Sequence, residues 1–112
     1  MSAHEMFVSC ARATGDLAGV FEHDGTSGYF YYYDRTRGEG GKVLGAIHVL
    51  TGTADFEESD VEVRWDREEA RVGLFIRGTL WAVFTAEGKY GGGYRTSVKP
   101  MIPSYISSAF NA

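Results

Sequence analysis

The sequence has few of the residues that cross-link or stiffen a chain, and it lacks any long hydrophobic run. Its 112 residues include one cysteine, Cys10, and two prolines. A lone cysteine excludes an internal disulfide, and a domain of this size without cross-links is typical of a reducing compartment. No apolar run approaches the roughly 20 residues of a transmembrane helix, and the first residues show no basic leader. We therefore expect a cytoplasmic protein that does not enter a membrane.

An excess of basic residues is also missing. The 11 Lys and Arg residues are outnumbered by 15 Asp and Glu residues, which gives a formal net charge of −4. This balance disfavours binding dominated by nucleic-acid phosphates, and it favours a basic partner or simple solubility. The three histidines, at positions 4, 23 and 48, are too dispersed for the close Cys and His spacing of a structural zinc site. We expect no metal site and no cofactor.

Glycine and aromatic residues, in contrast, are abundant. There are 15 Gly, seven Tyr and seven Phe residues, a composition typical of short strands joined by tight turns. The length matches one ordinary domain with one core. We predict a single β-rich domain over residues 1–112. Its fold class is mainly β, an antiparallel meander of about six to eight strands that forms a sandwich or partial barrel, with a short C-terminal helix.

The clearest strand pattern lies in residues 60–86, DVEVRWDREEARVGLFIRGTLWAVFTA. A two-residue turn at Arg77-Gly78 and an earlier turn within residues 66–69 make three strands. The earlier turn sets Arg64 opposite Arg71, an unfavourable pair of like charges. The reverse face is mixed and includes Phe75, Leu80 and Phe84. Because side chains alternate along a strand, the other face of these strands is predicted to lie in the core. Its residues are Val61, Val63, Trp65, Val72, Leu74, Ile76, Trp81 and Val83.

Two further segments have clear patterns. Residues 42–50, KVLGAIHVL, are apolar on both alternating faces. This predicts a central strand, with His48 as a hydrogen-bonded core histidine. Near the end, Pro103 precedes SYISSAF, which predicts a short helix packed on or across the sheet. Its apolar residues are spaced by four: Ile102, Ile106 and Phe110.

Residues 21–34, FEHDGTSGYFYYYD, raise the main functional question. A two-residue Asp-Gly turn would pair Phe21 with Gly28, whereas a four-residue DGTS loop would pair Phe21 with Phe30. The two registers differ by two residues, so the faces are the same in both. One face carries Phe21, Phe30 and Tyr32. The other carries Val20, Glu22, Tyr29, Tyr31 and Tyr33.

This stretch supports two functional interpretations. Exposed tyrosines beside arginine are common in protein–protein hot spots. We therefore expect a non-enzymatic protein-binding module, a small inhibitor or immunity-type protein that neutralises a toxin or other effector by stoichiometric complex formation. The partner-binding candidates are Tyr29, Tyr31, Tyr33, Arg35, Glu22 and Asp24. The alternative is a small-ligand-binding or hydrolytic β-domain that uses the turn formed by Glu22, His23 and Asp24.

Other motifs are less informative. Cys10 has no neighbouring histidine, and we interpret it as a structural residue. The glycine-rich residues 87–97, EGKYGGGYRTS, lack the order of a phosphate loop because the lysine precedes the glycines. A plain turn is favoured there over a bulge that presents Tyr90 and Tyr94 for binding. The negative charge disfavours single-stranded nucleic acid as a partner of the tyrosines. Homodimerisation through an open sheet edge is a further alternative.

Two neighbouring segments resemble a known family. FEHDGTSGYFYYYD at 21–34, followed by KVLGAIHVL at 42–50, is similar to a small family of uncharacterised bacterial proteins. That family is marked by a Phe-Glu-acid-acid-Gly turn, a Gly-Tyr-Phe-Tyr strand and a second strand ending near Ala-x-His. Here His23 takes one acidic position and Gly45 interrupts the second strand. The resemblance implies a bacterial origin and a compact β-rich domain, and it attaches no activity.

Overall fold

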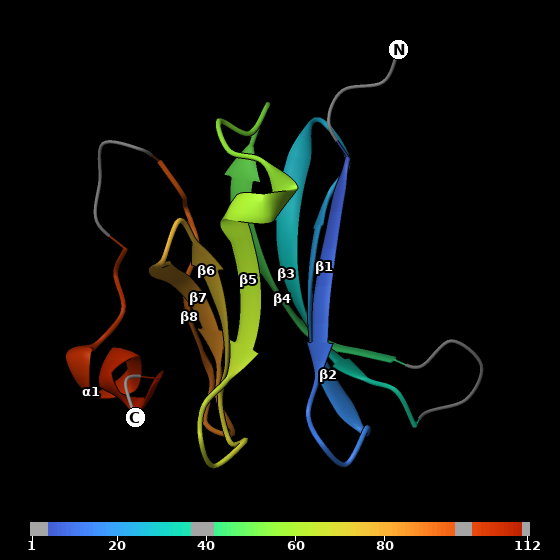
Figure 1. Ribbon diagram of the computed structural model, residues 1–112, viewed down its shortest axis with the longest axis vertical. Helices are drawn as coiled ribbons and strands as arrows, with labels where there is room; N and C mark the ends of the chain where they lie inside the picture. Colours follow the sequence, from blue (N-terminus) through green and yellow to red (C-terminus); the bar gives the residue numbers. More distant parts are fainter. Residues whose placement is uncertain (1–4, 37–41, 96–99, 111–112) are drawn as a thin grey trace.

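The computed structural model of the protein describes residues 5–36, 42–95 and 100–110. Within these ranges, eight strands form two four-stranded sheets that face each other (Figure 1). Neighbouring strands are antiparallel and follow one another in chain order in both sheets. The predicted class is therefore confirmed: the fold is mainly β, a meander with a short helix near the C-terminus. Of the two predicted arrangements it is the sandwich, and the sheets do not close into a barrel.

The first four strands form sheet A, and the hairpin around residues 24–27 decides between the two registers that the sequence allows. The strands are β1 (Met6–Ala11), β2 (Leu17–His23), β3 (Ser27–Asp34) and β4 (Lys42–Thr51). Phe21 pairs with Phe30 and His23 pairs with Gly28, so the turn is the longer DGTS loop. Both phenylalanines are fully buried between the sheets.

The last four strands form sheet B. They are β5 (Val61–Trp65), β6 (Val72–Ile76), β7 (Thr79–Phe84) and β8 (Lys89–Gly91), preceded by a 3-10 turn, η1 (Glu58–Asp60). The predicted two-residue turn at Arg77-Gly78 is confirmed, because Ile76 pairs with Thr79. Both turn residues have positive φ, 52° and 80°. Such values belong to the type I′ turn, whose twist matches that of the flanking strands.

The connection between β5 and β6 is two residues longer than predicted, so the register is shifted by two residues. Arg64 pairs with Gly73 instead of Arg71, so the like-charge pair does not form. The Asp66 carboxylate accepts hydrogen bonds from the backbone N–H groups of Ala70 and Arg71, at 2.9 and 3.1 Å. The Arg71 guanidinium donates to the same carboxylate at 2.9 Å. These bonds hold Asp66 at the end of the β5–β6 pairing. Because the register shifts by two residues, each side chain stays on its predicted face.

A β-bulge in β7 inverts the faces beyond it. The pairing of β6 with β7 skips Trp81, so the alternation of side chains changes phase at that residue. Phe84 joins the core between the sheets, and Val83 faces the opposite side of sheet B. The prediction that placed Val83 in the core and Phe84 on the reverse face is wrong for this reason.

The core lies between the two sheets and is closed along both margins. At one margin, the Trp65 indole Nε1–H donates to the Cys10 carbonyl oxygen at 2.9 Å, which joins β5 to β1. At the other, the backbone N–H groups of Gly93 and Tyr94 donate to two carbonyl oxygens of β4, at 3.3 and 2.6 Å. The buried core side chains include Phe21, Phe30, Ile47, Val49, Phe56, Val63, Val72, Leu74, Ile76, Trp81 and Phe84.

The terminal helix packs on sheet B, as predicted. It consists of α1 (Ser104–Ser107) followed by a 3-10 turn, η2 (Ser108–Phe110). Ile106 and Phe110 are buried in a second cluster on the side of sheet B that faces away from sheet A (Figure 1). The sheet residues of that cluster are Phe75, Leu80 and Val83. The mixed reverse face of the predicted hairpins is thus covered by the C-terminal segment.

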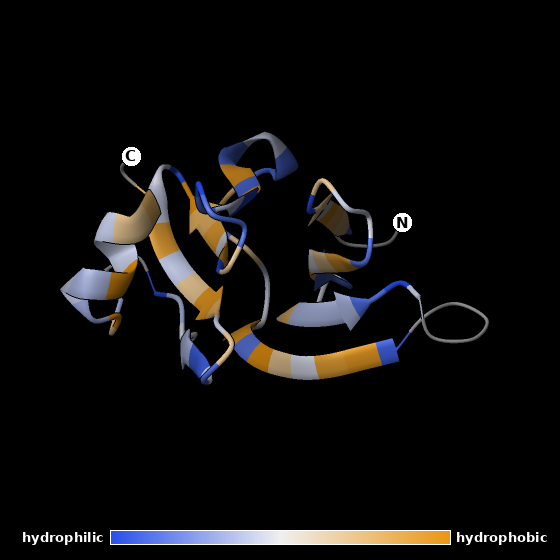
Figure 2. Ribbon diagram, turned by 90° about the horizontal axis from the view of Figure 1, so that it is seen from below, coloured by the Kyte–Doolittle hydropathy of each residue, from blue (hydrophilic) through white to orange (hydrophobic). Residues whose placement is uncertain are grey.

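β4 is an edge strand of sheet A, so its prediction as a central strand is wrong. Val43 and Leu44 are 48% and 43% exposed, and His48 is exposed as well. Figure 2 shows hydrophobic residues along much of this strand. The first residues of β4, Lys42 to Leu44, and His48 therefore form part of the protein surface. His48 is not the core histidine that the pattern predicted.

Candidate functional site

The outer face of sheet A carries the tyrosines and Glu22 of the predicted site. α1 and η2 cover the corresponding face of sheet B, whereas no described element packs over this face of sheet A (Figure 1). We call it the tyrosine face. Its side chains are Phe7, Ser9 and Ala11 of β1, Ala18, Val20 and Glu22 of β2, Tyr29, Tyr31 and Tyr33 of β3, and Val43, Ala46 and His48 of β4.

The tyrosines form a packed row along β3. The Tyr29 and Tyr31 rings are nearly parallel, with centroids 5.9 Å apart, and Tyr29 also lies 4.9 Å from the His48 ring. All three tyrosines are half-buried. Burial, followed by the negative charge of Glu22, raises the pKa of Tyr31, so its hydroxyl is a hydrogen-bond donor at neutral pH. The row presents aromatic edges and hydroxyl groups on the tyrosine face.

Carboxylates lie at one end of the tyrosine face. Glu22 is exposed beside Tyr29 and Tyr31. The Asp24 carboxylate accepts hydrogen bonds from the Thr26 and Ser27 backbone N–H groups, both at 2.9 Å, and from the Thr26 hydroxyl at 2.9 Å. These bonds lower the pKa of Asp24 to about 2. Asp24 thus organises the turn and keeps a negative charge there.

His23 lies apart from these carboxylates, inside the protein. Its side chain is 1% exposed. The Gly25 N–H donates to its Nδ1 at 3.1 Å, so the ring proton belongs on Nε2, which lies 2.9 Å from the Gly52 carbonyl oxygen. The imidazole therefore ties the β2–β3 hairpin to Gly52, directly after β4. His23 does not join Glu22 on the tyrosine face.

Arg35 lies at the other end of the tyrosine face, directly after β3. Its backbone N–H donates to the Asp16 carbonyl oxygen at 2.7 Å, and its guanidinium donates to the Gly15 carbonyl oxygen at 3.1 Å. The Asp16 carboxylate is bound by Arg12 at 2.7 and 2.8 Å. Arg12, followed by the Thr14 hydroxyl, holds the pKa of Asp16 well below its usual range. The predicted residues thus share one surface, with negative charge at one end and a guanidinium at the other.

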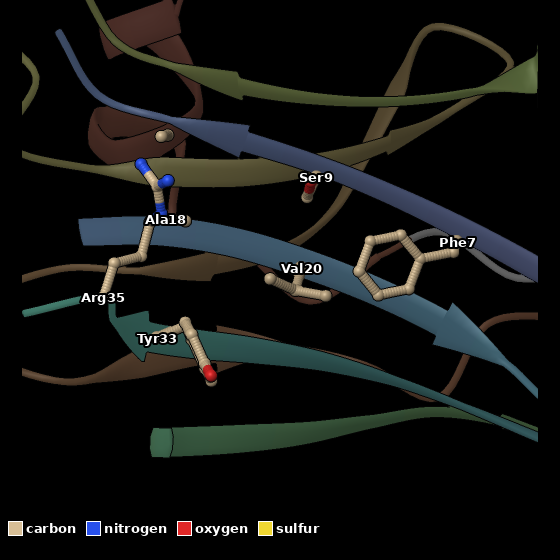
Figure 3. Close-up of a pocket in the computed structure, with 7 residues that line it drawn as sticks. Phe7, Ser9, Ala18, Val20, Tyr33 and Arg35 are labelled. Carbon is tan, nitrogen blue, oxygen red and sulfur yellow. The ribbon is translucent and has the colours of Figure 1, made fainter. Parts of the chain in front are cut away.

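A groove between β1 and β3 adds residues that the sequence did not single out. It has a volume of about 340 Å³ and passes over β2 (Figure 3). Phe7 stands at one end, and Tyr33 and Arg35 stand at the other. Its remaining lining residues are small or apolar: Ser9, Ala11, Ala18 and Val20. The strand-favouring residues Phe7 and Val8 in MFVSCA, residues 6–11, are the sequence signal that could have revealed its wall.

In the glycine-rich segment, of which residues 96 and 97 lie outside the described ranges, Gly92 and Gly93 link sheet B to sheet A through bonds to the Trp81 and His48 carbonyl oxygens. Residues 91–93 all have positive φ. Beyond them, Tyr94 packs edge-on against Trp81 and Phe56, and its hydroxyl donates to the Asp55 carboxylate at 2.8 Å. Burial, followed by this hydrogen bond, raises the pKa of Tyr94 to about 12. Tyr94 is therefore a packing residue.

Neither a metal-binding cluster nor a membrane-spanning helix occurs in the described ranges. No group of three or more His, Cys, Asp or Glu side chains there is arranged to hold a metal ion. None of the helices in those ranges is long and apolar enough to cross a membrane. Cys10 is a free, half-buried thiol whose pKa is raised by burial and then by the charge of Glu69.

Comparison with known proteins places the chain in a family. No curated protein and no solved structure matches it. Residues 1–105 match the family DUF2251, which is described as an uncharacterized protein conserved in bacteria. This agrees with the resemblance found in residues 21–50 and extends it over nearly the whole chain. The protein belongs to the bacterial family DUF2251.

Proposed function

We propose that this protein is a non-enzymatic binding module whose tyrosine face captures a protein partner in a stoichiometric complex. The observation that carries the proposal is the difference between the two outer faces. The apolar outer side of sheet B is covered by Ile106 and Phe110. The tyrosine face has no such cover among the described residues, and Phe7 on it is 60% exposed. Uncovered apolar and aromatic surface of this kind marks interaction sites.

The chemistry of the face suits a protein better than a nucleic acid. Tyrosine is enriched in hot spots because it combines apolar area with a hydroxyl group. The contact between Tyr29 and Tyr31 covers part of each ring face, which is the surface that a base would stack on. The carboxylates of Glu22 and Asp24 would repel phosphates at that end of the face. An inhibitor or immunity-type role in the cytoplasm, against a toxin or other effector, fits these properties.

The hydrolytic alternative has less support. It needs Glu22, His23 and Asp24 to converge on one substrate. His23 is buried with both ring nitrogens beside backbone groups, and Asp24 accepts three hydrogen bonds within its turn. A general base would also need a pKa near neutrality, whereas that of Asp24 is lowered to about 2. The binding proposal requires no such convergence.

An affinity capture from the native bacterial host tests the proposal. The tagged protein is compared with Tyr31→Ala, and Tyr105→Ala serves as the control because Tyr105 is 66% exposed on the helix that covers sheet B. We expect one stoichiometric partner to be retained by the protein and by the control. A hot-spot tyrosine is worth about 2 kcal/mol or more, so Tyr31→Ala should weaken binding roughly 30-fold. Equal capture by Tyr31→Ala, with its fold intact by circular dichroism, would contradict the proposal.

A further inference from the structure

The groove that runs along the tyrosine face from Phe7 to Arg35 has a specific chemical character. We propose that it receives a partner segment in which an apolar side chain lies next to a carboxylate, with the apolar group over Ala18 and Val20 and the carboxylate on Arg35. This inference rests on the proposed function and names the class of segment that the surface recognises. Three features of the groove carry it: its floor, its charge and its position on the face.

The floor of the groove can accommodate an apolar side chain. Small side chains on β1 and β2, at Ser9, Ala11 and Ala18, leave a depression between the larger Phe7 and Tyr33 (Figure 3). Its volume of about 340 Å³ is near the lower end of the range for small-molecule pockets. The floor is a single sheet with the packed core beneath it, so the groove is shallow. Such a shape suits one or two side chains of a protein segment.

The charge at the end of the groove is available to a partner. The Arg35 guanidinium is exposed and donates to the neutral Gly15 carbonyl oxygen, which holds it in place. It forms no ion pair with any described residue. Arg12 and Arg71, in contrast, are neutralised by carboxylates at 2.7 and 2.9 Å. A guanidinium with free N–H groups binds a carboxylate through short, charge-assisted hydrogen bonds.

The opposite end of the tyrosine face fixes the direction of the bound segment. Glu22 and Asp24 lie near the start of β3, whereas Arg35 follows its end. The eight residues of β3 separate the two ends by about 25 Å. An acidic group is repelled at the first end and attracted at the second. The apolar and acidic groups of the partner must therefore lie close together at the Arg35 end.

Selection from a displayed library of random linear peptides tests this assignment without knowledge of the partner. The folded protein is the bait, and two variants change the groove: Arg35→Glu reverses its charge and Ser9→Trp fills its floor. Arg35→Lys keeps the charge but loses the planar fork. The matched control is Arg67→Glu, because Arg67 is exposed in the turn after β5, on the other sheet. The consensus peptide is then synthesised and its affinity measured by fluorescence anisotropy.

We expect enriched peptides to carry an acidic residue next to an apolar one. Their affinity should fall roughly tenfold or more in Arg35→Glu and in Ser9→Trp, fall less in Arg35→Lys, and stay unchanged in Arg67→Glu. Peptides without an acidic preference, the same peptides selected by Arg35→Glu, or no enriched sequence would each overturn the inference. The proposed function would survive those results if Tyr31→Ala still lost its captured partner. If acidic peptides were selected but no partner were captured from the host, the groove inference would hold and the proposed function would fail.

Discussion

At the scale of single residues, Gly91 and Gly93 differ sharply although both have positive φ, 92° and 64°. A Cβ atom at Gly91 would overlap the Trp81 carbonyl oxygen, whereas one at Gly93 would meet no atom within 4 Å. We expect Gly93→Ala to lower the free energy of unfolding by about 1 kcal/mol, the cost of left-handed backbone. Gly91→Ala should cost about 3 kcal/mol or more. Urea unfolding measures both, and equal losses would refute the steric argument.

Asp24 gives the protein a pH-dependent stability. Its pKa is about 2 in the folded protein, below the ordinary value of 3.8. Because the folded state holds the charged form more strongly, this contribution is complete above about pH 4 and is lost as the pH falls towards 2. We expect the Tm to fall across that window. Asp24→Asn keeps an oxygen acceptor without the charge, so its Tm should fall less; superimposable curves would show that Asp24 contributes nothing.

The two described histidines show why the site was only partly predictable at this scale. Alternation correctly placed Tyr29, Tyr31 and Glu22 on one face, since the period of a strand is fixed. It could not show which face is covered, because that depends on segments far away in the chain. His48, predicted as a core histidine, is exposed, whereas His23, for which no burial was predicted, is buried. The groove residue Phe7 was missed because β1 was not recognised as a strand.

At the scale of elements, the short C-terminal helix is a structural cover. Ile106 is 2% exposed and packs on the outer face of sheet B, whereas Met101 in the same terminal segment is 85% exposed. Removing a buried isoleucine side chain down to Cβ costs about 2–5 kcal/mol. We expect Ile106→Ala to lower the unfolding free energy by that amount and Met101→Ala to change it by less than about 0.5 kcal/mol. Similar midpoints in a denaturant titration would mean that the helix is dispensable.

The Arg77-Gly78 turn could be predicted from the sequence, whereas the register between neighbouring strands was harder to predict. The Arg77-Gly78 turn was predicted correctly because glycine at a positive φ fits a two-residue hairpin. The register between β5 and β6 was displaced because the hydrogen bonds of the Asp66 carboxylate decide where the turn begins. The alternation of apolar residues before Trp81 does not predict the bulge at that residue. Such irregularities arise from packing between sheets, which a single strand pattern does not contain.

At the scale of the whole molecule, hydrogen bonds between the two sheets protect the edge strand β1. We call this line of bonds along β1 the seam. The β1 edge faces sheet B, and three polar groups of sheet B and its flanking turns occupy it. The Glu58 carboxylate accepts from the Phe7 N–H at 2.9 Å, and the Glu69 carboxylate accepts from the Ala13 N–H at 3.1 Å. Between them lies the bond from the Trp65 indole to the Cys10 carbonyl oxygen. Edges left open template pairing with other chains, so these bonds oppose association through β1.

We therefore expect removal of the Glu58 and Glu69 carboxylates to change the oligomeric state of the protein. In the double variant Glu58→Ala with Glu69→Ala, the Phe7 and Ala13 N–H groups lose their acceptors and the β1 edge becomes open to a second copy. We expect the wild-type chain to sediment as a monomer and the double variant to show a mass that rises with concentration. Glu68→Ala with Glu87→Ala removes the same charge from exposed positions that make none of these bonds. A monomeric seam variant, or equal association in the control pair, would mean that the edge is protected by other contacts or that net charge alone sets the assembly.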